Sequence, residues 1–234
     1  MKNIAIIAAR GGSKGLPGKN LKPLLGTQLI QWTVRQAISE GIFDEVLISS
    51  DSPEISIAAE QAGAKYLFDR PSYLASDTAT SVDTILHALE FLEPENYEYV
   101  TYLECTSPIR VKGDITQTVN ALIKNAAEYD ASVAVCKVKT HPAIMLKKEL
   151  NSFNPLGVVP KNMIRRQDLG DVFHPFGGIY VIKVSALKEF RTFYPERLTG
   201  FELQDFQAFE IDNPVDFICV EAVISEYSSK VARP

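Results

Sequence analysis

The chain has 234 residues, 46% of them hydrophobic, so it can bury a core of the size found in one α/β domain. Its 24 basic and 29 acidic residues give a net charge of −5, which excludes the broad positive surface that nucleic-acid binding needs. The three cysteines lie far apart in apolar segments, which disfavours a disulfide framework or a zinc cluster and favours a reduced, cytoplasmic protein.

Short β-branched runs alternate with helical patterns over the first 138 residues. The runs predict strands at 4–8, 46–49, 66–68, 99–103 and 132–138. Helices are predicted at about 28–40, at 54–62, from residue 80 or 81, and at about 114–127. This alternation predicts an α/β fold with a mostly parallel, Rossmann-like sheet and helices on both faces. The first apolar run is too short for a signal peptide, and no segment has membrane-spanning length, so no membrane association is expected.

The regular pattern breaks between residues 139 and 172, where polar residues, prolines and glycines interrupt any period. This stretch is too long for an ordinary connection, which predicts a lid, a binding loop or an oligomerisation arm inserted into a single domain spanning 1–234. Beyond it, the sequence predicts a strand at 178–184, a short helix at 185–190, a strand at 208–211 and a last helix from Asn213 and Pro214.

The loop after the first strand, residues 8–20, combines glycines with three cations, Arg10, Lys14 and Lys19. Glycines let backbone N–H groups turn toward an anion, and the cations suit a nucleoside triphosphate. The loop is not a P-loop, which would need glycine at Ser13, nor a dinucleotide fingerprint, which would need glycine at 13 or 14. A solvated glycine turn is the simpler alternative.

Residues 9–20, 70–79 and 106–110 resemble, in order, successive motifs of the acylneuraminate cytidylyltransferases, or CMP-sialic acid synthetases. The resemblance extends over essentially the whole chain. It implies a homodimeric enzyme that transfers CMP from CTP to the anomeric hydroxyl of a nine-carbon acidic 2-keto sugar and releases pyrophosphate. Magnesium is the implied cofactor, and CTP and the acidic sugar, or nonulosonate, are the implied small-molecule partners.

The resemblance also implies residues that bind the nucleotide. The catalytic residues would be Arg10, Lys14 and Lys19, which stabilise the triphosphate and the departing pyrophosphate, and Asp212, which holds the magnesium. The wider nucleotide site would comprise Ala8, Ala9, Arg10, Gly11, Gly12, Ser13, Lys14, Lys19, Asn20, Arg70, Ser76, Asp77 and Ser81. Capping of a helix is an equal alternative for Ser81, and Asp51 can face the same crevice or cap a helix.

Two carboxylates, Glu210 and Asp212, flank Ile211 at the end of the predicted 208–211 strand. On a strand they would share one face, with their backbones roughly 7 Å apart. Hard oxygen ligands suit Mg²⁺, and the resemblance implies that Asp212 binds the metal directly while Glu210 binds it directly or through water. A solvated strand edge is the alternative.

The sugar-binding residues are also implied by the resemblance: Glu104, Thr106, Ser107, Arg166, Tyr180, Phe193 and Tyr194. Arg166 would reach the active site of the partner subunit. Known sialic acid enzymes carry glutamine where this chain has Glu104, which brings a negative charge toward an acidic substrate. Further departures at Ile144, His174 and Phe176 favour a less common nonulosonate, such as legionaminic acid.

Several alternatives stay open on the sequence alone. A CMP-Kdo synthetase or another sugar nucleotidylyltransferase would share a glycine-rich basic first loop. A non-catalytic nucleotide-binding module is disfavoured by the intact cations together with Glu210 and Asp212. The sequence identifies neither the particular nonulosonate, nor a general base, nor the number of metal ions.

Overall fold

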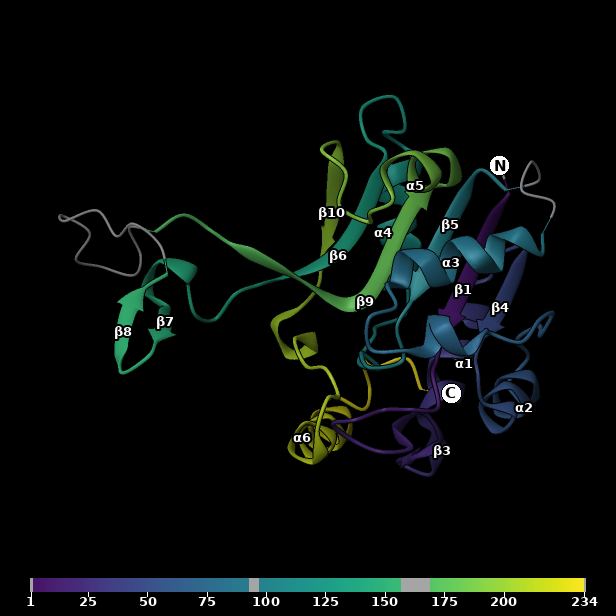
Figure 1. Ribbon diagram of the computed structural model, residues 1–234, viewed down its shortest axis with the longest axis horizontal. Helices are drawn as coiled ribbons and strands as arrows, with labels where there is room; N and C mark the ends of the chain where they lie inside the picture. The colour runs from purple at the N-terminus through teal and green to yellow at the C-terminus, as the bar shows by residue number, and fades with distance from the viewer. Residues whose placement is uncertain (1, 93–96, 157–168, 234) are drawn as a thin grey trace.

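A six-stranded sheet forms the centre of the computed structural model, which describes residues 2–92, 97–156 and 169–233 (Figure 1). The strand order is β10-β6-β9-β5-β1-β4. Five strands run parallel, and β9 alone pairs antiparallel with both of its neighbours. The strands are β1 (Asn3–Ala8), β4 (Glu45–Ser49), β5 (Tyr99–Leu103), β6 (Ala131–Lys137), β9 (Phe173–Lys183) and β10 (Leu198–Glu202). The predicted mostly parallel α/β sheet is therefore confirmed.

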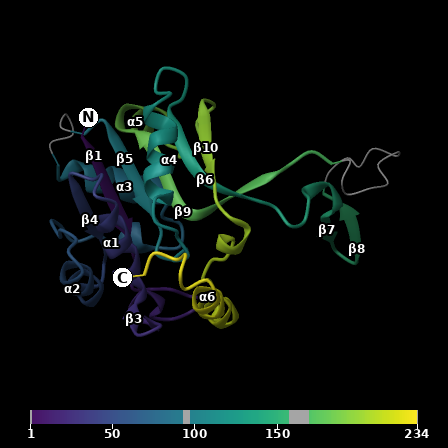
Figure 2. The ribbon, with the colours of Figure 1, turned by 180° about the vertical axis from the view of Figure 1, so that it is seen from behind.

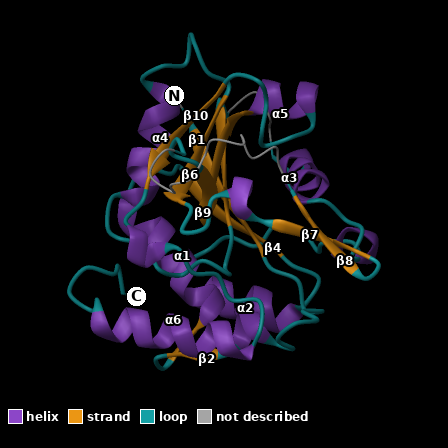
Figure 3. Ribbon diagram, turned by 90° about the vertical axis from the view of Figure 1, so that its left-hand side faces the viewer, coloured by secondary structure: helices purple, strands orange, loops and turns teal. Residues whose placement is uncertain are grey.

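Helices cover both faces of this sheet, as Figure 3 shows. They are α1 (Leu29–Glu40), α2 (Pro53–Gln61), α3 (Ser81–Glu90), α4 (Asp114–Ile123), α5 (Val184–Phe190) and α6 (Pro214–Glu226). Ala5 and Ile7 belong to an apolar cluster with residues of α1, α2, α4 and α6, whereas Ile4 and Ile6 belong to a second cluster with α3 and α5. Because β1 is buried on both faces, its sequence is a continuous apolar run rather than an alternating one.

The strand predictions fail where apolar residues are buried outside the sheet. Only an isolated bridge between Leu47 and Lys65 lies near the predicted 66–68 strand, and the predicted 208–211 strand is an extended loop. Phe68 and Ile211 are nevertheless buried, so their apolar character reflects core packing from loops. The edge strand β10 was not predicted, because its residues are mostly half-exposed and include Gly200.

A glycine bulge in β9 lies beside the end of β5. Gly177 and Gly178 have φ angles of 78° and 53°, a region that favours glycine. A Cβ atom on Gly178 would lie 2.6 Å from the Cβ of Glu104, so only glycine allows this approach. The predicted strand began at residue 178, but β9 continues through the bulge as far back as Phe173.

The predicted insertion at 139–172 lies within the described residues only at 139–156 and 169–172, and its hairpin projects from the body of the protein, as seen from both sides (Figures 1 and 2). It is more regular than expected, because β7 (Leu146–Glu149) and β8 (Ser152–Pro155) form an antiparallel hairpin whose residues are all exposed. The remaining short elements are β2 (Pro23–Leu24), β3 (Thr27–Gln28) and the 3₁₀ helices η1 (Lys19–Leu21), η2 (Ser72–Ala75), η4 (Pro142–Ile144) and η6 (Asp205–Gln207). Among the described residues, no helix is long and apolar enough to cross a membrane.

Candidate active site

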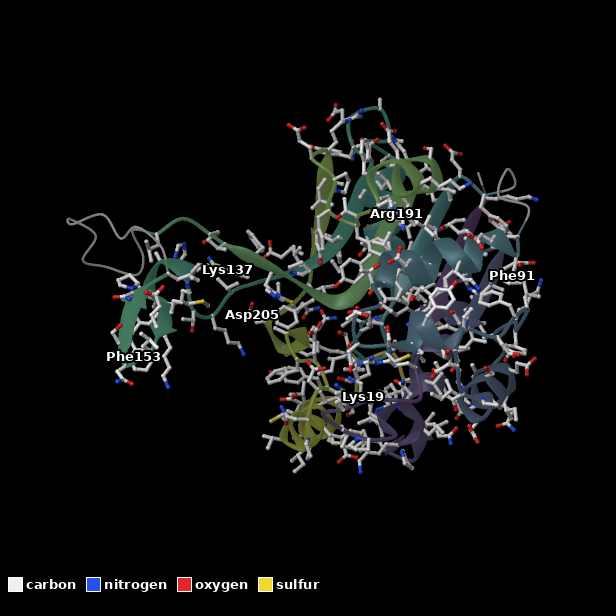
Figure 4. The ribbon with its side chains drawn as sticks, viewed as in Figure 1. Lys19, Phe91, Lys137, Phe153, Arg191 and Asp205 are labelled. Atoms are coloured by element: carbon white, nitrogen blue, oxygen red, sulfur yellow. The ribbon has the colours of Figure 1, made fainter. Side chains whose placement is uncertain are left out.

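An open pocket lies where the carboxyl ends of the adjacent parallel strands β1 and β5 meet. Four segments line it: the loop after β1, the segment leading into α3, the end of β5 and the residue that precedes Asn213. The lining residues are Ala8, Ala9, Arg10, Ser13, Lys14, Gly15, Lys19, Asn20, Arg70, Ser76, Asp77, Ala79, Ser81, Thr84, Tyr102, Glu104, Cys105, Thr106 and Asp212. Figure 4 shows Lys19 near the end of the sheet that faces α6.

Hydrogen bonds from other segments fix the loop after β1. The Asn20 side-chain amide donates to the carbonyl of Arg10 at 3.0 Å, and the Gly11 N–H donates to Asp51 Oδ1 at 2.9 Å. A Cβ atom on Gly15 would lie 2.1 Å from the carbonyl oxygen of Asp212, so the loop passes directly against that residue. Gly15 thus brings the basic loop and Asp212 together, although sequence reasoning assigned it no role in the site.

The three predicted cations all face carboxylates in this pocket. Arg10 Nη1 lies 3.1 Å from Asp77 Oδ1, and Lys14 forms a second ion pair with the same carboxylate. Lys19 Nζ donates to the Ile211 carbonyl at 2.9 Å and to Asp212 Oδ1 at 3.3 Å. The hydrogen bond from Lys14, supported by Arg10, lowers the pKa of Asp77. A triphosphate would therefore compete with Asp77 for Arg10 and Lys14.

Arg70 is buried at the side of the pocket, and its Nε donates to the Leu74 carbonyl at 2.9 Å. Burial lowers the pKa of its guanidinium group. The alternative of a helix cap for Ser81 is wrong, because Thr80 caps α3 and Ser81 lines the pocket. Asp51 is likewise not a cap, since Ser52 caps α2 while Asp51 holds the loop after β1.

A buried arginine, Arg110, ties the end of β5 to the bulge in β9. Its Nη2 donates to the Glu104 carbonyl at 2.7 Å, and its Nε donates to the Gly177 carbonyl at 2.8 Å. Burial lowers the pKa of Arg110 to about 10. The resemblance included Arg110 in its third motif without giving it a function, and the structure shows that it supports the pocket wall from behind.

The Glu210 and Asp212 carboxylates do not share the face of a strand, because residues 208–211 are a loop. Ile211 points into the core, and its N–H donates to the Thr106 carbonyl at 2.8 Å. Asp212 is exposed and lines the pocket, whereas Glu210 lies outside the lining and accepts a hydrogen bond from Ser107 Oγ at 3.0 Å. Burial raises the pKa of Glu210.

The exposed Asp212 carboxylate in the pocket lining fits Mg²⁺, which commonly takes one or two protein carboxylates and fills its shell with water and phosphate oxygens. The described ranges contain no cluster of three or more His, Cys, Asp or Glu residues that could hold a metal by themselves. The donors present therefore suit a magnesium ion that arrives with the nucleotide.

The aromatic residues predicted to bind the sugar lie beside the pocket rather than in its lining. Tyr102, which does line it, stacks on Tyr180 and Phe193 at ring-centre distances of 5.6 and 5.5 Å, and Tyr194 lies edge-on to Tyr180 at 6.1 Å. Gly11, Gly12, Ser107 and Glu210 also lie outside the lining, and Arg166 falls outside the described residues. Tyr102 was missed because an aromatic residue within a buried strand is typical of core packing.

A family described as "Cytidylyltransferase" matches residues 4–161. The pseudaminic acid cytidylyltransferase of Campylobacter jejuni subsp. jejuni serotype O:2 is 35% identical over 184 residues, which cover 77% of this chain and 78% of that protein. The N-acylneuraminate cytidylyltransferase of Streptococcus agalactiae serotype III is 30% identical over 222 residues, which cover 94% of this chain and 52% of that protein.

Solved structures share the fold. A CMP:2-keto-3-deoxy-manno-octonic acid synthetase complexed with CTP superposes with a TM-score of 0.73 at 18% identity, covering 97% of this chain and 99% of that one. A 4-diphosphocytidyl-2C-methyl-D-erythritol synthase from Anaerococcus prevotii gives a TM-score of 0.65 at 13% identity. At these identities the likeness establishes the fold alone. The family match and the curated relatives, taken together with the pocket, show that this chain belongs to the cytidylyltransferase family.

Proposed function

We propose that this chain transfers CMP from CTP to the anomeric hydroxyl of a nine-carbon acidic 2-keto sugar and releases pyrophosphate. The observation that carries the proposal is the pocket, which holds Arg10, Lys14 and Lys19 against the acidic side chains Asp77 and Asp212. The names of the curated relatives, a pseudaminic acid and an N-acylneuraminate cytidylyltransferase, support both the nucleotide and the class of sugar.

In this proposal the three cations neutralise the triphosphate and the departing pyrophosphate. Asp77 would be the counter-ion of Arg10 and Lys14 before the nucleotide arrives, and Asp212 that of Lys19. Preorganised charge of this kind lowers the barrier to phosphoryl transfer without covalent participation by the protein. Within the loop the Gly12 N–H would be offered to the phosphates, since the N–H groups of Gly11 and Ser13 already donate to Asp51 and to the Gly11 carbonyl. Arg70, Ser76 and Ser81 would contact the cytidine.

Magnesium would bind to Asp212, with Glu210 acting from behind through water. When bound, the ion would act as a Lewis acid toward the phosphate oxygens. The exposed Asp212 carboxylate beside Lys19 supports this assignment. The sugar would lie toward Glu104, Thr106 and Ser107, with Tyr180, Phe193 and Tyr194 flanking it.

We infer that the inserted segment, residues 139–172, is the arm through which two copies of this single-domain protein associate. The exposed apolar side chains on its hairpin support the inference: Leu146, Leu150 and Phe153 are 61%, 95% and 63% exposed. An isolated two-stranded hairpin is only marginally stable in water, so burial against a second chain would stabilise it. Light scattering on the whole chain and on a variant with L146S and F153S tests this: a monomeric parent chain would refute the inference.

The three cysteines are free, which suits the reducing cytoplasm, where we expect the enzyme to act. The decisive assay measures pyrophosphate release with Mg²⁺, a panel of nucleoside triphosphates and a panel of acidic sugars. We expect release only with CTP and nonulosonates. Release with an eight-carbon octulosonate instead would favour the CMP-Kdo reaction, and nucleotide binding without release for any sugar would favour a binding module.

A further inference from the structure

The carboxylate of Glu104 lines the pocket at the end of β5, and of the three cations of the first loop only Lys19 acts on its pKa. Its Oε1 accepts a hydrogen bond from the Tyr102 hydroxyl at 3.1 Å. In the part of the chain that the structure describes, Glu104 takes part in no ion pair. The side chain is half-exposed and lines the pocket, so a ligand can reach it.

Arg110, the arginine nearest in sequence, makes no ion pair with this carboxylate within the described residues, although its charge opposes the rise in the pKa of Glu104. Arg110 uses its guanidinium group on the carbonyls of Glu104, Gly177 and Gly178 and on the side chain of Gln36. Its direct contact with Glu104 is therefore to the backbone and not to the side chain. A carboxylate that is largely removed from water costs free energy unless it is paired, so the pocket leaves Glu104 in need of a partner.

A second carboxylate makes this end of the pocket more acidic. Glu210 lies near enough to raise the pKa of Glu104, although burial raises it more. Two acidic side chains would repel the carboxylate of a nonulosonate. The acidic end of such a sugar should therefore point toward the cations, and another part of the sugar should face Glu104.

Aromatic rings surround the same place. Tyr102 stacks on Tyr180 and Phe193, and Tyr180 meets Tyr194 edge-on. Tyr102 is buried against these rings, whereas Tyr194 is 51% exposed and can present its ring to a cation, and the carboxylate of Glu104 adds a direct ionic partner. This combination favours an organic cation over a neutral polar group of the same size.

We propose that Glu104, together with Tyr102, Tyr180 and Tyr194, binds a basic nitrogen substituent of the sugar, an amidine or an amine. An amidinium group donates two parallel N–H bonds to one carboxylate, whereas an amide offers a single, weaker donor. The inference rests on the proposed function, because it concerns the sugar that the same pocket would take. It makes Glu104 a residue that determines which sugar is chosen.

The test compares two nonulosonates that differ at one carbon only, where one carries an acetamido group and the other an acetamidino group. These groups have nearly the same shape and differ by one positive charge. Binding of each sugar is measured by calorimetry in the presence of CTP, and turnover is measured by pyrophosphate release. The proteins compared are the parent chain, E104Q, E104D and the control E60Q, which removes an exposed carboxylate from α2.

We expect the parent chain to bind the acetamidino sugar at least about tenfold more tightly, the scale of one charge-assisted hydrogen bond. E104Q should lose or reverse this ratio, whereas E104D, which keeps the charge, and E60Q should retain it. Equal affinities in the parent chain, or an unchanged ratio in a folded E104Q, would overturn the inference. If the ratio behaves as expected but no pyrophosphate is released from either sugar, the proposed function fails and the binding assignment stands.

Discussion

The two ends of the pocket differ in how they balance charge. At the proposed nucleotide end, Arg10, Lys14 and Lys19 already face carboxylates, so an incoming triphosphate would exchange one anionic partner for another. At the sugar end, Glu104 and Glu210 have hydroxyl groups as hydrogen-bond partners instead of cations. The comparison suggests that one end is built to bind an anion and the other to bind a donor of hydrogen bonds.

The largest effect is expected from the nucleotide end. K19A removes a side chain that is only 15% exposed and that contacts both Ile211 and Asp212. We expect kcat to fall by at least about 100-fold, because preorganised charge acts directly on the transition state. K65A is the matched control, since Lys65 pairs with Glu45 outside the pocket. Similar rates of pyrophosphate release in the two variants would contradict the assignment of Lys19.

Asp212 should have the next largest effect. D212N keeps the shape of the side chain but removes the charge that would hold Mg²⁺. We therefore expect the Mg²⁺ concentration that gives half the maximal rate to rise roughly 10- to 100-fold. A titration of pyrophosphate release against Mg²⁺ measures this, and E226Q at the exposed end of α6 serves as the control. If D212N shows the metal dependence of the parent chain, Asp212 is not the ligand.

Gly15 tests whether the two parts of the nucleotide end must touch. In G15A the new Cβ atom would lie 2.1 Å from the Asp212 carbonyl, so the backbone has to move. We expect a loss of about 1–3 kcal/mol in the free energy of unfolding, together with weaker CTP binding. G170A is the control, because a Cβ there meets no atom within 4 Å. Equal denaturant midpoints for both variants would show that the close approach is unimportant.

At the proposed sugar end, loss of a charge should stabilise the protein, whereas the changes at the proposed nucleotide end should impair it. Burial raises the pKa of Glu104 above the ordinary glutamate value of 4.5, so the folded chain holds this proton more tightly than the unfolded chain. Stability therefore falls as the pH rises through this range. E104Q should raise Tm at pH 7, by about 2–4 °C for each kcal/mol gained in the free energy of unfolding. The gain should vanish below about pH 4.5. A lower Tm at pH 7 would contradict this account.

The smallest effect concerns two buried cysteines, Cys136 and the pocket residue Cys105. Burial raises the pKa of the Cys105 and Cys136 thiols to about 12, so both stay protonated near neutral pH. We expect alkylation of the native protein to reach half-exposed Cys219 first, as judged by mass spectrometry of its peptides. Raising the pH above 9 should lower stability, since unfolded thiols ionise before buried ones. Rapid labelling of native Cys105 would show that the pocket wall opens.

Sequence reasoning located the parts of this site that depend on local order. The loop at residues 8–20 follows a buried strand, and its cations do line the pocket. It could not find Gly15 against Asp212, or Arg110 against Gly177, because these contacts join residues far apart in the chain. The Glu210 and Asp212 pair illustrates the same limit: the alternation suggested a strand, while the fold uses Ile211 as a buried anchor between two diverging carboxylates.

The pairing of strand β9 restricts where residues can be inserted or deleted in this part of the chain. Its residues 173–175 pair with β6 toward the projecting hairpin, and its later residues pair with both β5 and β6 beyond the glycine bulge. Because side chains on a strand alternate between faces, one residue inserted between Phe173 and Gly178 would reverse which side chains face the core. A change of length at the tip of the hairpin therefore leaves the register of the central sheet unchanged, whereas a change at its root shifts that register.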